Sequence, residues 1–426
     1  MAASLSTLDA LLKNVYLPGI TSWIYNQRPI WDRIQKDADK SRFSGREYIM
    51  AAKTANTEGV GARAEGAALP LPQNTSLVNM TLQMGYHYAT IKLSRQIISA
   101  ADSAIGGFAD AIDVEVTAAR EALELDMARA AVFGDASGFM GRVLSGGGAS
   151  PATLVLYAQP TNVGMPGVKF IRSGQVLDTY TALSGGSNHA LAWTASSVIG
   201  GTTNSFILTG TAGGGNPAND DYIFRNLARG VEMMGIAGIV DDGTLVSSFQ
   251  GLTRSSNPGL QANVLANGGT LRAVSTDLMD QGAAASQTSQ TPSGSAWPTA
   301  IYTRLEIQRR AANFIRADRR FDPKEMTLNN GYKAMEWTTP GGTIPWIYDY
   351  FVRDNQIFFV NEQDLIRAVQ EEIQWDEMDG SMWIRDMVSN SGAGSHAYTA
   401  TLFTFQQIGS RRCSSHTLCK DVSYTL

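Results

Sequence analysis

The strongest constraint on the fold is one long repeat of apolar residues at steps of three and four positions. Charged residues fill the positions between them. The repeat consists of Ile105, Phe108, Ile112, Val116, Ala119, Leu123, Met127, Ala130 and Phe133. Asp102 is suited to cap the first turn, and Gly134 stands where a helix-ending glycine is common. The pattern predicts a single amphipathic helix of roughly 30 residues, about 45 Å long, which forms a spine.

Two predicted strands precede this helix, at residues 44–50 and 79–93. The segment between them, residues 56–76, reads NTEGVGARAEGAALPLPQNTS and has too few large apolar residues to pack a core of its own. Loops of this length in compact domains are usually functional or mobile. We therefore expect a long hairpin whose tip does not pack against itself.

The N-terminal residues predict a short helix followed by an apolar arm. The helix rests on Leu5, Leu8, Leu11, Leu12 and Val15, and Pro18-Gly19 ends it. The segment that follows contains Trp23 and Trp31. Because a solvent-exposed arm would not carry two tryptophans, we expect it to lie across its own core or across a neighbour.

From about residue 143 the apolar pattern changes to period two, with glycine between the runs. Short strands are predicted at residues 152–158, 167–182, 189–198, 205–210 and 220–225. Strands at this spacing with Gly, Asn and Ser turns are typical of a small antiparallel barrel or sandwich. This part is predicted to be an inserted β module.

The remaining residues mix helices and strands. Helices are predicted at 226–234, 300–316 and 362–370, and strands at 344–351, 356–360 and 398–406. The fold class is therefore α+β with an inserted β module.

Composition excludes several classes of protein. Of the 426 residues, 43% are hydrophobic, which excludes a disordered chain. No run of about 18 apolar residues predicts a membrane span, and the first residues lack the basic and apolar regions of a secretory signal. The chain has only two cysteines, which argues against a disulfide scaffold.

The charge content points to contacts with other subunits. The formal net charge of −5 gives no overall basic field for nucleic acid. Charged residues make up 17% of the chain, against about 25% in typical proteins. Because the cores of interfaces are depleted in charge, part of the surface is expected to be buried against other copies.

Two motifs contain residue types found in ligand sites. Gly59–Gly66 (GVGARAEG) is rich in glycine, but ALPLP follows it and cannot open the helix that a phosphate loop requires, so a flexible hairpin tip is favoured. Cys413, His416 and Cys419 supply three zinc-type ligands where zinc usually takes four. In an extended tail His416 would point away from both cysteines, so ordinary tail residues are favoured over a metal site or an inter-subunit disulfide.

Acidic residues gather in two places, at Asp241-Asp242 and at Glu371, Glu372, Asp376, Glu377 and Asp379. Paired carboxylates can bind a cation or transfer protons. Neither group has the spacing of a calcium loop or a nearby histidine, so a solvated strand face or a turn is favoured.

Basic residues crowd the helix predicted after Pro298, at Arg304, Arg309, Arg310, Arg316, Arg319 and Arg320. They cover more than one helix face, which favours pairing with acidic neighbours over inter-subunit ion pairs or contact with packaged DNA. None of the four histidines lies in a nucleophile motif. The sequence therefore predicts no catalytic residue, no cofactor and no metal, and the protein is not expected to be an enzyme.

The order of these parts resembles the major capsid proteins of tailed double-stranded DNA bacteriophages, which have the Hong Kong 97-type fold. A hairpin over residues 45–93 leads directly into the helix 103–133. The C-terminal third carries Ile344-Pro345, the strand 356–360 with Asn361, Trp375, Asp379-Gly380 and a late strand at 397–403. The resemblance is one of order and pattern over nearly the whole chain, without a single decisive motif. The β segment exceeds the minimal plan of the family and looks like an insertion domain found in some members.

The resemblance implies named parts with the following boundaries: an N-terminal arm (1–42), an extended E-loop hairpin (43–95), a P-domain with the spine helix (96–142), a β-rich insertion domain (143–225), an axial A-domain (226–340), and returning P-domain strands with a C-terminal tail (341–426).

The function implied by the resemblance is structural. Copies of the chain would form the hexamers and pentamers of an icosahedral head in the virion, assembled in the host cytoplasm around double-stranded DNA. The implied partners are other copies, a portal protein, a separate scaffolding protein, in some phages a decoration protein, and DNA held by weak non-specific contact, with no membrane. Because Lys53 lies near the predicted strand and not at the tip, a covalent crosslink between subunits is not expected.

The residues expected to contact other subunits lie in the arm and the hairpin tip. They are Trp23, Trp31, Gly59, Arg63, Glu65, Pro70 and Pro72. A second set, for inter-subunit ion pairs or for DNA, is Arg304, Arg309, Arg310 and Arg316. Ordering such segments costs about 1–2 kcal/mol per residue in backbone entropy, which burial against a partner must offset.

The sequence leaves two other functions open. The first is a cargo-enclosing nanocompartment shell of the same fold, although such proteins are typically shorter and lack the β insert. The second, from a different class, is a β-rich adhesion module, which the absence of a signal peptide and the long spine helix disfavour.

Overall fold

A computed structural model describes residues 28–37, 43–45, 47–57, 59–94, 111–158, 165–201, 203–210, 215–288, 296–317, 325–327, 333–377, 380–385 and 397–423. The chain divides into two compact units. The smaller unit contains residues 89–122 and 375–402, and the larger contains residues 27–88, 123–374 and 403–426. No helix of the described residues is both long enough and apolar enough to cross a membrane.

The smaller unit has its own apolar core. Ile91, Ala119 and Ala400 are buried together, and Val116, Trp375 and Trp383 pack against them. Its strand β22 (Ile384–Arg385) pairs antiparallel with β23 (Ala397–Ser410), so that Ile384 lies opposite Thr399. The helix α3 (Ala111–Phe133) begins in this unit and ends in the larger one.

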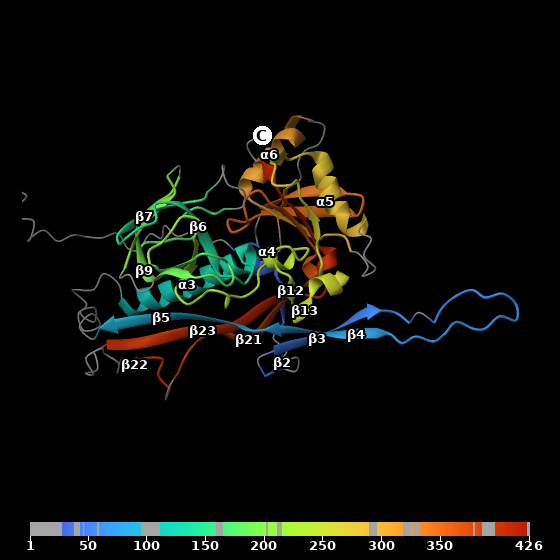
Figure 1. Ribbon diagram of the computed structural model, residues 1–426, viewed down its shortest axis with the longest axis horizontal. Helices are drawn as coiled ribbons and strands as arrows, with labels where there is room; N and C mark the ends of the chain where they lie inside the picture. Colours follow the sequence, from blue (N-terminus) through green and yellow to red (C-terminus); the bar gives the residue numbers. More distant parts are fainter. Residues whose placement is uncertain are drawn as a thin grey trace, which may run out of the picture. The chain divides into compact units, whose positions relative to one another are not determined.

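Within the larger unit, a seven-stranded sheet carries an extensive apolar core. Its strand order is β14 (Asn263–Leu265), β24 (Thr417–Cys419), β20 (Ile357–Val360), β16 (Ala300–Thr303), β19 (Gly342–Tyr348), β18 (Lys333–Thr339) and β17 (Glu325–Thr327). The helices α5 (Thr276–Thr288) and α6 (Leu305–Ala317) lie beside this sheet (Figure 1). Ile301, Trp346 and Phe359 are fully buried between them.

A closed barrel forms the second part of the larger unit. Going round the barrel, its strands are β10 (Ser205–Thr209), β7 (Ala152–Leu156), β6 (Phe139–Ser145), β11 (Tyr222–Arg225), β8 (Val176–Tyr180) and β9 (Asn188–Ile199). Leu154, Trp193, Phe206 and Ile223 have no exposed surface and fill its interior. Of the two predicted alternatives, the barrel is therefore confirmed and the sandwich is wrong. The barrel begins at Phe139, so the boundary predicted at residue 143 falls inside its first strand.

The predicted hairpin is confirmed in the larger unit as β3 (Glu47–Ala55) and β4 (Ser76–Gln83), with β2 (Phe43–Ser44) beside β3. The register runs from Glu47 opposite Gln83 to Ala55 opposite Ser76. At its base, Tyr48, Leu82 and Met84 pack with Ala368. Figure 1 shows the two strands continuing into a long loop beyond their paired region.

The remaining sheet joins strands that are distant in the sequence. Its order is β1 (Lys36–Asp37), β21 (Leu365–Trp375), β23 and β22, and β5 (Gly85–Ser94) also pairs with β23. The short elements are β12 (Ser248–Phe249), β13 (Leu252–Thr253), β15 (Arg272–Ala273), β25 (Val422–Ser423), α4 (Ile236–Ile239), and the 3-10 helices η2 (Trp31–Arg33), η4 (Arg254–Ser256), η5 (Pro258–Leu260), η6 (Glu362–Asp364) and η7 (Cys413–Ser415).

Three helix predictions are wrong in whole or in part. Residues 226–234 form turns, and helix begins only at Ile236. Ala300–Thr303 is a strand, because it is buried between two strands of the sheet and its apolar run has no polar face. Residues 365–370 belong to β21, where pairing with β1 overrides spacing that also fits a helix. The predicted spine helix is described from Ala111 onward, and its first residues lie outside the described part of the chain.

Candidate assembly surface

The loop beyond β3 and β4, here called the hairpin tip (residues 59–72), exposes large apolar side chains. Val60, Leu69 and Leu71 have 82%, 84% and 82% of their surface exposed. Each would contribute about 1.5–3 kcal/mol if a partner buried it. Exposed apolar groups that cluster on one projection commonly mark an interaction site.

Local contacts alone define the shape of the hairpin tip. The amide of Ala67 donates to the carbonyl of Ala64 at 3.1 Å, closing a turn that contains Gly66 at a φ of 76°, where glycine avoids the strain of a side chain. Arg63 donates through Nε to the carbonyl of Ala68 at 3.0 Å. A Cβ on Gly59 would lie 3.3 Å from the Cα of Pro72, so the two sides of the loop are in close contact there.

The structure thus brings five predicted contact residues together in the hairpin tip: Gly59, Arg63, Glu65, Pro70 and Pro72. Their contact with another subunit stays a prediction. Trp23 lies outside the described residues. Trp31 is 7% exposed and packs within its own unit, with the Arg367 guanidinium 4.3 Å from its ring centroid, so it is not a surface that a neighbour reaches.

The predicted arginine group separates into different environments. Arg304 is an internal group: it donates to the carbonyl of Tyr350 at 2.9 Å and pairs with Asp354 at 3.2 Å and Glu306 at 3.3 Å. Burial alone would lower its pKa, but Asp354 and Glu306 raise the pKa above its ordinary value. The favoured interpretation, pairing with acidic neighbours, therefore fits Arg304, and its contact with DNA or another subunit stays a prediction.

Arg309 is exposed on α6 and Arg310 is half-buried there. Arg316 belongs to the same helix, but its side chain lies outside the described residues, as do Arg319 and Arg320 entirely. The contact of Arg309, Arg310 and Arg316 with another subunit or with DNA therefore stays a prediction.

The C-terminal Cys-x2-His-x2-Cys motif is part of the core. The 3-10 helix η7 contradicts the extended tail assumed from the sequence. Burial raises the pKa of Cys413 to about 11 and that of Cys419 to about 12, so both are protonated thiols at neutral pH, and both are free. Within the described ranges, no group of three or more His, Cys, Asp or Glu is arranged to hold a metal.

His416 is fully buried between two hydrogen bonds. Its Nδ1 accepts from the amide of Asn361 at 3.1 Å, so Nε2 carries the proton and donates to the Ser410 hydroxyl at 3.1 Å. Burial lowers the pKa of His416 from 6.5 to about 4.

This histidine predicts an acid-sensitive subunit. Below pH 6.5 the unfolded chain protonates His416 while the folded chain does not, so stability falls as the pH drops from 6.5 to about 4. The loss from this group should reach about 3 kcal/mol and then level off. Denaturant unfolding of the unassembled subunit at several pH values measures it. A His416→Gln variant should lose the part of the slope that this group contributes, while His87, whose pKa burial also lowers, keeps its own part. An unchanged slope would contradict the assignment.

The two predicted acidic groups lie in a turn and on a strand, as the favoured interpretation expects. Asp241 is buried, and its Oδ2 accepts from the amides of Gly243, Leu245 and Val246 at 2.9–3.0 Å, which shapes the turn. Glu371 and Glu372 lie on β21, and Asp376 and Glu377 follow it in exposed positions. Asp379 lies outside the described residues.

A buried ionic network that the sequence did not reveal holds the C-terminal half of α3. Arg129 is 3% exposed, donates through Nε to Asp126 at 2.9 Å, and pairs with Glu232. Asp126 also pairs with Arg225 at the end of β11, at 2.8 Å. Burial alone would lower the pKa of Arg129, but Glu232 and Asp126 raise the pKa above its ordinary value.

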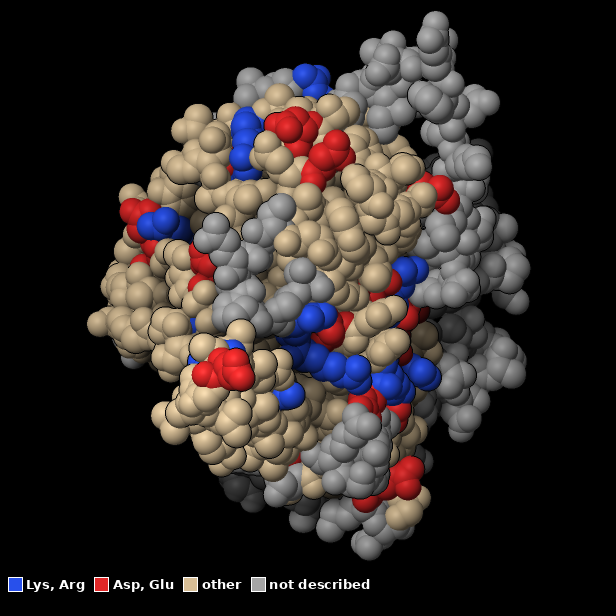
Figure 2. Space-filling view, turned by 90° about the vertical axis from the view of Figure 1, so that its right-hand side faces the viewer, with Lys and Arg blue, Asp and Glu red and all other residues tan. Residues whose placement is uncertain are grey.

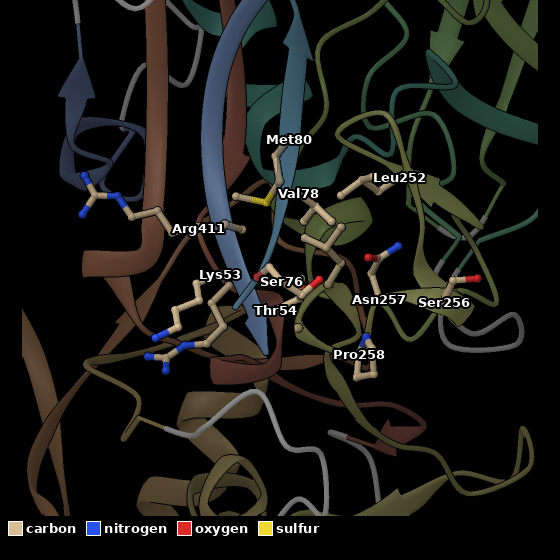
Figure 3. Close-up of a pocket in the computed structure, with 14 residues that line it drawn as sticks. Lys53, Thr54, Ser76, Val78, Met80, Leu252, Ser256, Asn257, Pro258 and Arg411 are labelled. Carbon is tan, nitrogen blue, oxygen red and sulfur yellow. Dashed lines mark hydrogen bonds between the residues drawn. The ribbon is translucent and has the colours of Figure 1, made fainter. Parts of the chain in front are cut away.

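A second missed feature is a pocket of about 360 Å³ at the base of the hairpin tip. Figure 3 shows it between the two hairpin strands, which contribute Lys53, Ser76 and Val78, and the loop that carries Leu252 and Asn257. Arg411 and Arg412 complete the lining from the end of β23. No sequence signal unites residues 53, 257 and 411, because only the fold brings them together.

Charge is sparse on the face seen in Figure 2. Uncharged residues cover most of the described surface there, and the charged side chains gather in small groups. This distribution agrees with the low charged fraction of 17% and is typical of surfaces that meet other proteins.

The sequence matches no protein-family model, and no curated protein is detectably similar to it. Solved structures, in contrast, are similar along the whole chain. The capsid asymmetric unit of cyanophage A-1(L) has a TM-score of 0.57 at 11% identity, with 99% of both chains covered. The capsids of native and empty gene transfer agent (GTA) particles have TM-scores of 0.51 and 0.52 at 10% identity, with 99% of this chain and 100% of theirs covered.

These similarities cover 99% of the chain, so they concern the fold as a whole. The α+β class predicted from the order of the elements is confirmed. The chain has the Hong Kong 97-type fold of tailed-phage capsid proteins.

Proposed function

We propose that this chain is the major capsid protein of a tailed bacteriophage, and that its copies form the hexamers and pentamers of an icosahedral head around double-stranded DNA. The observation that carries the proposal is the similarity to capsid chains over 99% of the sequence. The exposed apolar hairpin tip supports it, because Val60, Leu69 and Leu71 find no burial within the subunit.

In this proposal the parts of the chain have the roles expected for the family. Residues 1–42 serve as the arm and 43–95 as the E-loop. The spine helix and the returning strands make up the P-domain, and residues 226–340 make up the axial A-domain. The barrel from Phe139 to Arg225 acts as an insertion domain.

The proposed partners follow from the same role. Copies of the chain are the principal partner, with a portal protein, a separate scaffolding protein and, where present, a decoration protein. DNA is held by weak non-specific contact, since the net charge is −5 and Arg304 is neutralised internally. Assembly takes place in the host cytoplasm, and the mature location is the virion.

The test is expression of the chain followed by negative-stain electron microscopy and sedimentation velocity. We expect closed shells, tubes, or rings of five and six copies, with co-expression of a scaffolding protein as a second condition. A stable monodisperse monomer under both conditions would rule the proposal out. Nuclease-protected DNA in particles from infected cells would favour a phage head over a cargo-enclosing compartment.

A further inference from the structure

The pocket at the base of the hairpin tip combines an apolar floor with basic groups. Val78, Met80, Leu252 and Leu260 line the floor, and Met80 and Leu260 are buried. Three cationic side chains also line the pocket, those of Lys53, Arg411 and Arg412, and its lining includes no carboxylate. The pocket therefore combines positively charged side chains with an apolar surface.

Two of the three cations are available to a partner. Arg412 pairs with Asp364 at 3.3 Å. Lys53 and Arg411 are exposed, and neither side chain has a hydrogen-bond or ion-pair partner among the described residues. In Figure 3 both side chains lie on the side of the hairpin strands opposite Leu252 and Asn257, and the Arg411 guanidinium extends away from Lys53. These two cations, Lys53 and Arg411, are called the basic rim below.

The chain also carries an acidic segment at the end of β21. Four carboxylates fall within residues 371–377, the sequence EEIQWDE. Glu372 pairs with Lys36, and Glu371 accepts from the side chain of Gln374 at 3.1 Å. Asp376 and Glu377 are adjacent and exposed, and their carboxylates have no cation partner in the described part of the chain.

We infer that the basic rim formed by Lys53 and Arg411 binds the carboxylates of Asp376 and Glu377 from a second copy of this chain. This inference rests on the proposed function, since it names a contact that assembly would form. The two cations are complementary in charge to the two carboxylates, and the apolar side chains of the pocket suit a peptide segment. A phosphodiester backbone fits less well, because half of the pocket lining is apolar and nucleic-acid sites are strongly positive.

Charge reversal with rescue tests this contact in the full-length chain. Neutralising exposed ion pairs has little effect, but placing like charges opposite each other in an interface costs several kcal/mol. We therefore compare the double variant Lys53→Glu/Arg411→Glu, the double variant Asp376→Lys/Glu377→Lys, and the quadruple variant that combines them. Arg172→Glu, an exposed reversal on the barrel and outside the pocket, is the matched control. Shell yield is measured by sedimentation at fixed protein and salt concentration.

Each double variant should reduce shell yield more than tenfold, and the quadruple variant should recover at least half of the wild-type yield. Arg172→Glu should assemble normally. Rescue also shows that the double variants fold, because a second pair of charge reversals elsewhere in the chain would not restore a misfolded subunit. Double variants that assemble like the wild type, or a quadruple variant that stays defective, would overturn the inference.

Two further outcomes are separable from these. If the shells form normally but the Lys53→Glu/Arg411→Glu particles retain less DNA, the rim binds phosphate and the inference fails. If the wild-type chain itself forms no assemblies, the proposed function is wrong. The inferred contact between copies is then wrong as well, because it depends on assembly.

Discussion

Deleting Gly59–Pro72 is expected to abolish stable shells while leaving the subunit folded. The deleted residues contribute no member to any buried apolar cluster of the described chain, and their hydrogen bonds are local. The paired strands end before them, at Ala55 and Ser76. In an assembly, Val60, Leu69 and Leu71 together would supply about 5–9 kcal/mol per copy if fully buried. Val60, Leu69 and Leu71 are among the most exposed large apolar side chains of the described residues.

The measurement has two parts. Circular dichroism and denaturant unfolding of the deletion variant should match the wild-type subunit to within about 0.5 kcal/mol, as for most surface changes. Sedimentation should show only subunits or small oligomers. A length-matched control keeps the loop but changes Val60, Leu69 and Leu71 to serine, which separates apolar contact from loop length. Shell yield and stability equal to wild type in the deletion variant would show that the hairpin tip has no role in assembly.

The sequence predicted the elements whose pattern is local. The helix that ends at Phe133 and the alternating strands of the barrel depend on spacings within one segment, and both exist. Residues 365–370 were predicted as helix, because Leu365, Ile366, Ala368 and Val369 fit a helical stripe. Arg367 and Ala368 pair with β1, more than 300 residues earlier in the chain, and β23 lies on the other side of β21. Such distant pairing leaves no trace in a local window.

Sites were harder to predict than elements, since they depend on what the fold brings together. Arg304 looked like a surface cation by its helix position, yet Asp354 and Tyr350 from a different loop neutralise and bury it. The basic rim needs Lys53 and Arg411, which are unremarkable singly and meet only at the hairpin base. The tip residues were predictable, because a segment too poor in apolar residues to fold alone is recognisable from composition.

The buried pair of Arg129 and Glu232 gives the largest expected effect on subunit stability. Arg129 joins two carboxylates, those of Asp126 and Glu232, and all of Arg129 except 3% is removed from water. Removing one partner of such a network leaves a buried charge uncompensated, which costs about 3–5 kcal/mol. Burial raises the pKa of Glu232, with Arg129 acting in the opposite direction, so the carboxylate depends on this arginine to stay ionised.

Arg129→Met should therefore lower the free energy of unfolding of the unassembled subunit by about 3–5 kcal/mol, measured by denaturant titration. The double variant Arg129→Met/Glu232→Leu should recover at least half of that loss, because the unpaired carboxylate is gone and Asp126 keeps Arg225 at 2.8 Å. Arg120→Met, an exposed change on the same helix, is the control and should shift stability by no more than about 0.5 kcal/mol. If the double variant were as unstable as Arg129→Met, the cost would come from lost packing of the arginine stem and not from the stranded charge. Since Asp126 keeps Arg225 in every variant, a loss that follows the charge would show that Arg129 holds α3 electrostatically to the segment after β11, which carries Glu232.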